Sequence, residues 1–214
     1  MIAATGTRTA TCEHHGPFDS VRYLGAIWSR CPICAEAEQA AEDLREQQAA
    51  ERAATASLAA AIEHCGLPER FRDRSLATFV CSTPGQAKAK AAAQRLAEAI
   101  VAGPPSGRSL MFVGRPGTGK THLGAAMMRH LIGAGKTARY YTVQGFMRSV
   151  KDSWVKGSPS SESAVIGSVV APDLLILDEV GVQFGSEFER QVLFDVLDQR
   201  YGARKGAVLI SNLE

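Results

Sequence analysis

The stretch of sequence that decides the fold is Gly114-Arg115-Pro116-Gly117-Thr118-Gly119-Lys120-Thr121. It matches the pattern G-x-x-x-x-G-K-[ST], with a short apolar run before it at 109–113 and a helical pattern after it at 120–132. Glycines let such a loop curl until its N–H groups point at phosphate oxygens, and the following helix adds the positive end of its dipole. The sequence therefore predicts a site for the phosphates of ATP. Its backbone is expected to come from Gly114, Gly117, Thr118 and Gly119.

Four polar side chains are predicted to complete this phosphate site. Lys120 is expected to place its ammonium between the β- and γ-phosphates, and the Thr121 hydroxyl to ligate Mg²⁺, which prefers oxygen ligands. The apolar run at 174–177 ends in Asp178 and Glu179, at the strand edge where parallel sheets bind ligands. We expect Asp178 to hold Mg²⁺ and Glu179 to polarise the attacking water. Two acids after a strand could also be a solvated turn, and the preceding P-loop argues against that interpretation.

The fold class follows from alternating patterns in the second half of the chain. Apolar runs predict strands at 109–113, 138–143, 173–177 and 207–211, while helical patterns occupy 83–103, 120–132, 145–154 and the region after 186. The stretch 156–162 is rich in glycine, serine and proline, which predicts an exposed loop. Strands that alternate with helices predict an α/β fold with a parallel sheet covered on both faces. Asn212 follows the fourth strand. It could orient the attacking water if that strand is central, and otherwise it is a turn asparagine.

A second kind of site is predicted near the N-terminus. Two pairs of residues there have the spacing C-x₂-H and C-x₂-C, and they are Cys12, His15, Cys31 and Cys34. Four soft or borderline ligands in two close pairs suit tetrahedral Zn²⁺ in a structural role, because so short a segment cannot bury a sufficient core. His14 is an alternative to His15 as the histidine ligand. The other interpretation of the cluster is a set of free thiols in a disordered arm.

Composition and patterning suggest how the chain is organised. Net charge is +2 and 45% of residues are hydrophobic, so no strong global field points to nucleic acid or membrane. No secretory signal or membrane-length apolar run is found, and a cytoplasmic location without a membrane partner is expected. We predict a zinc-binding module at 1–35, a helix at 36–66 and an ATPase core at 67–214. Few large apolar residues line the helix, which favours a solvated connector over a partner-binding surface.

Several stretches together resemble the bacterial and phage helicase loaders of the DnaC, DnaI and IstB type, which are AAA+ ATPases. They are Gly-Leu-Pro-Glu-Arg-Phe (66–71), Phe-Val-Gly-Arg-Pro-Gly-Thr-Gly-Lys-Thr-His-Leu (112–123), Leu-Leu-Ile-Leu-Asp-Glu-Val-Gly (174–181), Arg200-Tyr201 and Ile-Ser-Asn-Leu (210–213). The resemblance covers roughly 66–214, and His122-Leu123 after the P-loop makes it more specific than a bare ATPase motif. It implies an AAA+ parallel sheet preceded by a small zinc module and a connector helix.

The resemblance also implies a role in DNA replication, in a protein of phage or prophage type. Such proteins bind the hexameric, DnaB-type replicative helicase through their N-terminal region and place it on single-stranded DNA, with ATP-dependent self-assembly. By motif match, Lys120 and Thr121 take the Walker A role, Asp178 and Glu179 the Walker B role, and Asn212 the sensor-1 role. An IstB-like helper of transposition is one alternative. A zinc-dependent adaptor with a non-hydrolytic nucleotide switch is another.

Candidate DNA contacts lie on the helix and loop after the second predicted strand. Arg148, Lys151 and Lys156 could neutralise phosphates, and Phe146 or Trp154 could stack on bases. The alternative interpretation is a solvated basic face around a core aromatic residue.

The chain departs from the implied family pattern at its C-terminal end. In the family, the arginine finger and the sensor-2 arginine follow the Ser-Asn-Leu strand, whereas this chain stops at Glu214. Arg200 and Arg204 do not occupy the finger position. We therefore expect a truncated product or a fragment that binds nucleotide better than it hydrolyses it. Its first predicted strand would lie unprotected at the sheet edge.

Overall fold

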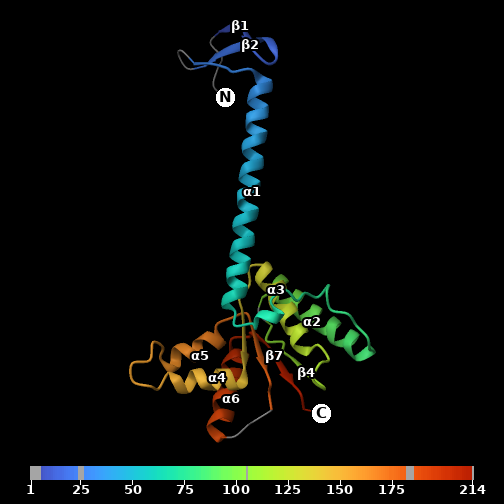
Figure 1. Cartoon of the computed structure of the whole chain (residues 1–214). Coiled ribbons are helices and arrows are strands. Elements are labelled where there is room, and N and C mark those ends of the chain that lie inside the picture. Colours follow the sequence, from blue (N-terminus) through green and yellow to red (C-terminus); the bar gives the residue numbers. More distant parts are fainter. Residues whose placement is uncertain (1–5, 24–26, 105, 182–185, 214) are drawn as a thin grey trace. The chain divides into compact units, whose positions relative to one another are not determined.

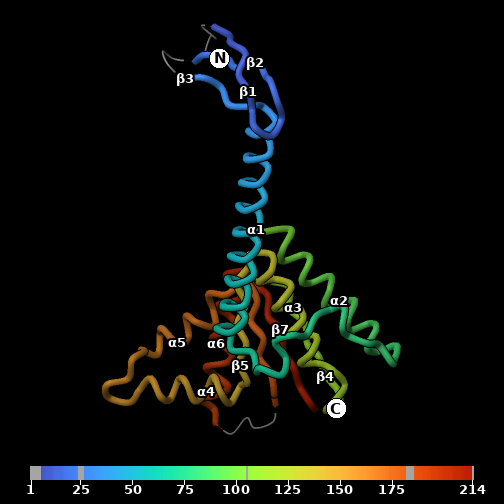
Figure 2. The backbone as a smooth tube through the Cα atoms, turned by 45° about the horizontal axis from the view of Figure 1, so that its top comes forward, coloured from blue at the N-terminus to red at the C-terminus, as the bar shows by residue number. Residues whose placement is uncertain are grey.

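The structure is a computed structural model that describes residues 6–23, 27–104, 106–181 and 186–213. Contacts within the chain divide it into two compact units, Met1–Ser57 and Leu58–Glu214, which are described separately below. Figures 1 and 2 show both units in two views. Helix α1 (Pro32–His64) begins in the first unit and ends in the second.

The N-terminal unit contains a small antiparallel sheet that the sequence did not predict. Strands β1 (Thr7–Cys12) and β2 (Gly16–Tyr23) form a hairpin with Cys12 opposite Gly16, and β3 (Ile27–Trp28) pairs with β2. Gly16 has φ +77°, a left-handed conformation that a glycine adopts without steric cost at this turn. The hairpin and the start of α1 thus supply the two turns that the cysteine spacing predicted.

The C-terminal unit is built on a four-stranded parallel sheet in the order β4-β7-β6-β5. The strands are β4 (Leu110–Val113), β5 (Ala138–Thr142), β6 (Leu174–Asp178) and β7 (Gly206–Ser211). Every residue of β6 is buried, as expected for a central strand with helices on both faces. The predicted α/β class is therefore confirmed, and β7 lies between β4 and β6.

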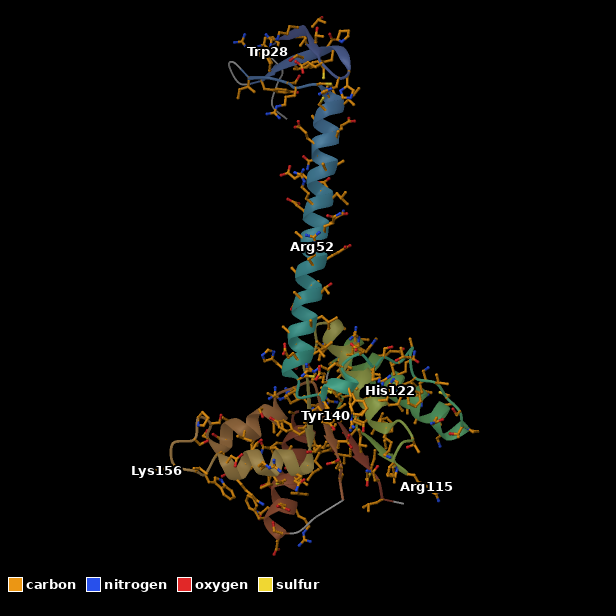
Figure 3. All side chains as sticks on the ribbon, viewed as in Figure 1. Trp28, Arg52, Arg115, His122, Tyr140 and Lys156 are labelled. Carbon is orange, nitrogen blue, oxygen red and sulfur yellow. The ribbon has the colours of Figure 1, made fainter. Side chains whose placement is uncertain are left out.

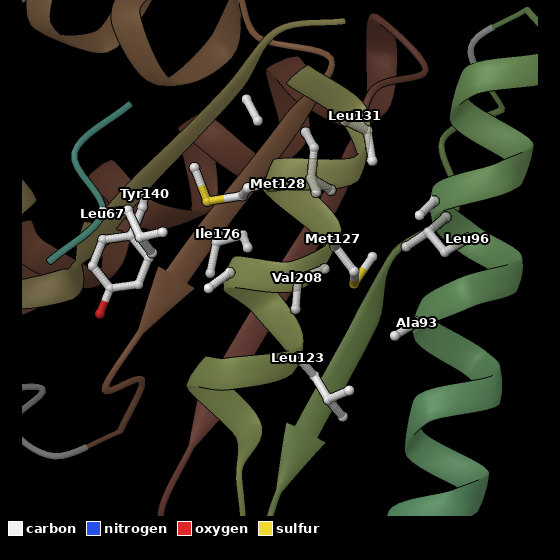
Figure 4. Close-up of a cluster of buried hydrophobic side chains, with 14 of the residues drawn as sticks. Leu67, Ala93, Leu96, Leu123, Met127, Met128, Leu131, Tyr140, Ile176 and Val208 are labelled. Carbon is white, nitrogen blue, oxygen red and sulfur yellow. The ribbon is translucent and has the colours of Figure 1, made fainter. Parts of the chain in front are cut away.

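Two helical layers cover the sheet (Figure 1). One face carries α2 (Pro84–Ala102) and α3 (Lys120–Gly133), and the other carries α4 (Val143–Asp152), α5 (Glu162–Val170) and α6 (Glu187–Gly202). Each layer of helices encloses one cluster of buried hydrophobic side chains against the sheet. Successive side chains of β6 point to opposite faces, so Leu174 and Ile176 belong to the first core cluster, with α2 and α3, while Leu175 and Leu177 belong to the second, with α4, α5 and α6. Figure 4 shows part of the first cluster, where α3 packs on the sheet and against α2.

Local sequence signals explain several helix ends. Thr83 and Gln86 form the predicted capping box at the start of α2, and Ser186 caps α6 through the Glu189 N–H. Helix α5 was not predicted, because 156–162 was interpreted only as a loop. The loop in fact ends at Ser161, whose hydroxyl accepts a hydrogen bond from Ala164 N and starts a short apolar helix.

Strand β4 lies at the edge of the sheet, as predicted for the first strand of the ATPase core. The side chains of Met111 and Val113 on this strand are 56% and 53% exposed. At the opposite edge, the backbone N–H of Tyr140 on β5 donates to the carbonyl oxygen of Cys65 at 2.8 Å. None of the helices among the described residues has the length and apolarity needed to cross a membrane.

Arg200 on α6 is buried, with 1% of its surface exposed. Its guanidinium donates to main-chain carbonyls around the end of α5 and the starts of β6 and β7, and these belong to Val169, Val170, Pro172, Asp173 and Gly206. Burial lowers the pKa of Arg200 to about 10. Arg200 therefore joins α5 and α6 to the sheet, and it lies outside the lining of the cavity at the nucleotide site described below.

Candidate nucleotide and metal sites

The P-loop connects β4 to α3 through three glycines in the left-handed region. Gly114, Gly117 and Gly119 have φ of +148°, +81° and +91°. These angles are strained for other residues, so the loop conformation depends on glycine. Gly119 is also sterically confined, because a Cβ atom there would lie 2.5 Å from the Phe79 ring. The Phe79 side chain and the P-loop are therefore in close contact.

Lys120 is the first residue of α3, and its side chain turns back over the P-loop. Its Nζ donates to the carbonyl oxygens of Gly114 at 2.6 Å and Arg115 at 2.8 Å. Burial lowers the pKa of Lys120, and the nearby charge of Asp178 opposes that effect. A cation at the N-terminal end of α3 reinforces the attraction of this loop for phosphate.

Asp178 ends β6 and receives hydrogen bonds on both carboxylate oxygens. The Thr121 hydroxyl donates to Oδ2 at 2.8 Å, and the Tyr140 hydroxyl donates to the same oxygen at 2.9 Å. The backbone N–H of Glu179 donates to Oδ1 at 2.7 Å. Glu179 itself has φ +62°, an uncommon conformation for a residue other than glycine. A hydroxyl beside a carboxylate offers the oxygen ligands that Mg²⁺ prefers.

A cavity of about 480 Å³ opens over these groups. It is lined by Arg70, Phe71, Pro116, Gly117, Gly119, Lys120, Thr121, His122, Tyr140, Asp178, Glu179 and Asn212. Seven of the nine residues predicted for the nucleotide site are in this lining. The other two, Gly114 and Thr118, line an adjacent cavity of about 460 Å³, which Lys120 also borders. Asn212 satisfies the condition set for it, because β7 is a central strand.

Apart from Pro116 of the P-loop, four residues of this lining had no predicted role. Arg70 and Phe71 come from the short 3₁₀ helix η1 (Glu69–Phe71). The sequence analysis used residues 66–71 only as part of the resemblance to the helicase loaders. His122 lies with Nε2 3.2 Å from the Ser75 carbonyl oxygen and meets the Phe79 ring edge-on. Tyr140 gave no sequence signal, because it is one alternating residue of a buried strand. Figure 3 labels His122 and Tyr140 in the C-terminal unit.

The predicted zinc ligands come together in the N-terminal unit. The ligand atoms of Cys12, His15, Cys31 and Cys34 all lie within 4.8 Å of one another. His15 Nδ1 is 3.3 Å from Cys34 Sγ and 3.7 Å from Cys12 Sγ and Cys31 Sγ. Cys12 and His15 come from the hairpin, whereas Cys31 and Cys34 come from the start of α1. The structure groups His15, not His14, with the three thiols.

These donors fit a zinc ion by chemistry and spacing. Ligands bound at about 2.0–2.3 Å in a tetrahedron lie roughly 3.3–3.8 Å apart. The three distances from His15 and the distance of 3.5 Å between Cys12 Sγ and Cys34 Sγ fall in that range. Hydrogen bonds from the backbone of His14 and His15 lower the pKa of Cys12 to about 6, which favours the thiolate that binds metal. The hydrogen bond to Cys12 raises the pKa of Cys34 to about 11. Three thiols and one imidazole would complete the coordination of one Zn²⁺.

The predicted DNA contacts divide into exposed and buried residues. Phe146 is fully buried in the second core cluster, so the prediction that it stacks on bases was wrong and the core interpretation holds for it. Lys151 is exposed and pairs with Glu189 at 2.9 Å. Trp154 is 52% exposed and donates through Nε1 to Glu162. The remaining two basic residues, Arg148 and Lys156, are exposed.

Fold and site together define a P-loop nucleotide-binding protein of the AAA+ type. A profile described as IstB-like ATP binding protein matches residues 89–214. The chain belongs to this IstB-like ATP-binding family.

Individual proteins show the same likeness. Over 149 residues the chain is 32% identical to a protein named Replicative helicase loader DnaC from Buchnera aphidicola subsp. Schizaphis graminum, covering 70% of this chain and 59% of that protein. It is 35% identical over 104 residues to the protein of that name from Escherichia coli K12, covering 49% and 42%. A crystal structure of the DnaC helicase loader superposes with TM-score 0.61 at 22% identity, covering 69% and 81%. The chain therefore spans about half the length of these curated relatives.

Proposed function

We propose that this chain is an ATP-binding and ATP-hydrolysing replication protein that loads, or helps to load, a DnaB-type replicative helicase onto single-stranded DNA. Membership of an ATP-binding family supports the nucleotide part. The names of the relatives, replicative helicase loaders, support the helicase part. The single observation that carries the proposal is the contact of 2.8 Å between the Thr121 hydroxyl and the Asp178 carboxylate beside the P-loop.

The proposed roles of the nucleotide-site residues follow from where their polar atoms lie. Amides of the P-loop bind phosphate oxygens, and Lys120 exchanges its loop carbonyls for the β- and γ-phosphates. Thr121 and Asp178 would hold Mg²⁺, which would supply positive charge to neutralise the phosphates. Glu179 accepts a proton from the attacking water, and Asn212 orients that water from the neighbouring strand.

A binding experiment tests the nucleotide part. Lys120→Ala removes the ammonium that lies over the P-loop carbonyls, and loss of a charge-assisted contact should weaken ATP binding by roughly 10–100-fold. Arg95→Ala, at an exposed position of α2, is the matched control and should bind as the unaltered chain does. Equal ATP affinity for both variants in a fluorescent-nucleotide titration would contradict the assignment of Lys120.

Co-purification tests the helicase part. The full chain should retain a DnaB-type hexamer on an affinity column, and ATP should change the amount retained. Adding single-stranded DNA then tests whether the assembled complex binds that strand. No retention under any nucleotide condition would defeat the loader proposal while leaving the ATP site intact.

An IstB-like helper of transposition is the second candidate, and the matching family profile favours it. The same affinity column distinguishes the two when purified transposase replaces helicase. Retention of transposase alone would select this second function.

The division of the chain into a zinc module at 1–35, a connector helix at 36–66 and an ATPase core at 67–214 is part of the proposal. The extent of α1 and the four grouped metal-binding residues support it. Zinc has a structural role in this scheme, because four protein ligands leave no open coordination position.

A further inference from the structure

Tyr140 stands out because it contacts the candidate metal site from a strand that carries no recognised motif. Its side chain is 6% exposed and its hydroxyl donates to Asp178 Oδ2 at 2.9 Å. Strands β5 and β6 pair with Tyr140 opposite Ile176, so the phenol extends along the sheet to reach Asp178 two residues further on. A buried tyrosine hydroxyl normally finds a partner, and here the partner is a carboxylate proposed to bind Mg²⁺.

Two hydrogen bonds to Asp178 come from groups with no proposed part in Mg²⁺ binding: the Glu179 N–H donates to Oδ1, and the Tyr140 hydroxyl donates from a side chain to Oδ2. The Thr121 hydroxyl also donates to Oδ2, but Thr121 is itself a proposed Mg²⁺ ligand, so its position would be set partly by the ion. Tyr140 has no such competing role. Groups that hydrogen-bond a ligating carboxylate fix its orientation and tune its affinity for the metal.

The phenol of Tyr140 is itself held firmly in place. Its ring belongs to the first core cluster, to which Leu67 also belongs, and Figure 4 shows the hydroxyl pointing away from the other labelled side chains of the cluster. Its backbone N–H donates to Cys65 O at 2.8 Å. Gly66 packs so closely on Tyr140 that a Cβ atom there would lie 2.5 Å from the Tyr140 carbonyl oxygen. The hydroxyl is therefore presented by a rigid support.

We infer that Tyr140 is a positioning residue for the magnesium–nucleotide complex, holding the Asp178 carboxylate in the orientation that ligates Mg²⁺. The inference rests on the proposed ATP site and adds to it a residue that acts through Asp178 without touching the nucleotide phosphates. Removing the hydroxyl should weaken the response to Mg²⁺ and leave metal-free nucleotide binding unchanged.

Tyr140→Phe tests this, because it removes one oxygen and keeps the ring that belongs to the first core cluster. ATP affinity is measured by titration in EDTA and across a Mg²⁺ series. We expect the Mg²⁺ concentration at half effect to rise roughly tenfold, as for other groups that orient metal ligands. Affinity in EDTA should stay within about twofold, since phosphate binding by the P-loop does not use the phenol.

Tyr141→Phe is the matched control. Tyr141 is the next residue of β5, and its hydroxyl contacts Ser168 and the Arg139 guanidinium instead of Asp178. Thermal unfolding of both variants shows whether the fold is retained. A Mg²⁺ requirement for Tyr140→Phe equal to that of Tyr141→Phe would overturn the inference. Absence of Mg²⁺-dependent ATP binding by the unaltered chain would overturn the proposed function and the inference together.

Discussion

The two candidate sites of this molecule are stabilised in different ways. The nucleotide site lies on a parallel sheet with a core cluster on each face, and its residues come from β5, β6, β7, η1 and the P-loop. The zinc site joins a short hairpin to the start of α1, and the buried residues described in that unit are Ser20 and Cys31. A large core can hold a site in place without its ligand, whereas a small unit depends on the metal itself.

Removal of zinc should have the largest effect of the changes considered, and that effect should be confined to the N-terminal unit. Structural zinc sites contribute about 10–16 kcal/mol of apparent binding free energy, so chelation or Cys31→Ser should unfold the N-terminal sheet. Trp28, which lies under the Arg8 guanidinium, reports this by fluorescence in a Trp154→Phe background.

The matched controls for zinc are one cysteine and one histidine from outside the cluster. Cys81→Ser and His14→Ala should keep one zinc per chain, whereas His15→Ala should lose it. An emission spectrum of Trp28 unchanged by complete zinc removal would show that the N-terminal unit folds without metal, and the contrast with the ATPase unit would fail.

Arg200→Met should produce the next largest effect, in the C-terminal unit alone. It leaves several buried carbonyls without their donor, which should lower the free energy of unfolding by about 3 kcal/mol or more. Urea denaturation measures this while zinc content is followed in parallel. Arg204→Met, at an exposed position just after α6, is the control. A loss of zinc in Arg200→Met would contradict the independence of the two units.

Gly119→Ala sharpens the comparison within the nucleotide site. The left-handed φ and the close Phe79 ring should together cost about 1–3 kcal/mol, and ATP affinity should fall as the loop distorts. Gly133→Ala, in α3 with open space around its Cβ position, is expected to leave ATP affinity unchanged. Isothermal titration calorimetry of both variants with ATP checks this. Equal ATP affinities would contradict the claim that ATP binding depends on the left-handed conformation of Gly119.

Ser161→Ala should have the smallest effect. It removes the N-cap of α5, for which about 1 kcal/mol is typical. Ser163→Ala, two residues on, leaves the hydrogen bond to Ala164 N in place and should change stability less. The difference between their thermal unfolding midpoints measures the cap.

Sequence identified the parts of both sites that depend on local backbone geometry. The P-loop glycines, the acidic end of β6 and the two ligand pairs lie in short stretches whose spacing specifies the structure. Tyr140 could not be found in this way, because its role depends on a contact between two strands that are far apart in sequence. The N-terminal strands were missed because most of their residues are exposed. The sequence left Phe146 open between a stacking residue and a core residue, because it did not show which face of the helix is buried.

The link between Cys65 and Tyr140 makes the two edges of the parallel sheet unequal. At β5, backbone that leaves α1 already uses a main-chain donor of the edge strand, and Arg139 donates to the adjacent His64 carbonyl. At β4, the exposed edge carries apolar side chains. Addition of a further strand, from a later segment of the same protein or from another chain, would therefore be directional, because it can extend the sheet beside β4 but meets an occupied position beside β5.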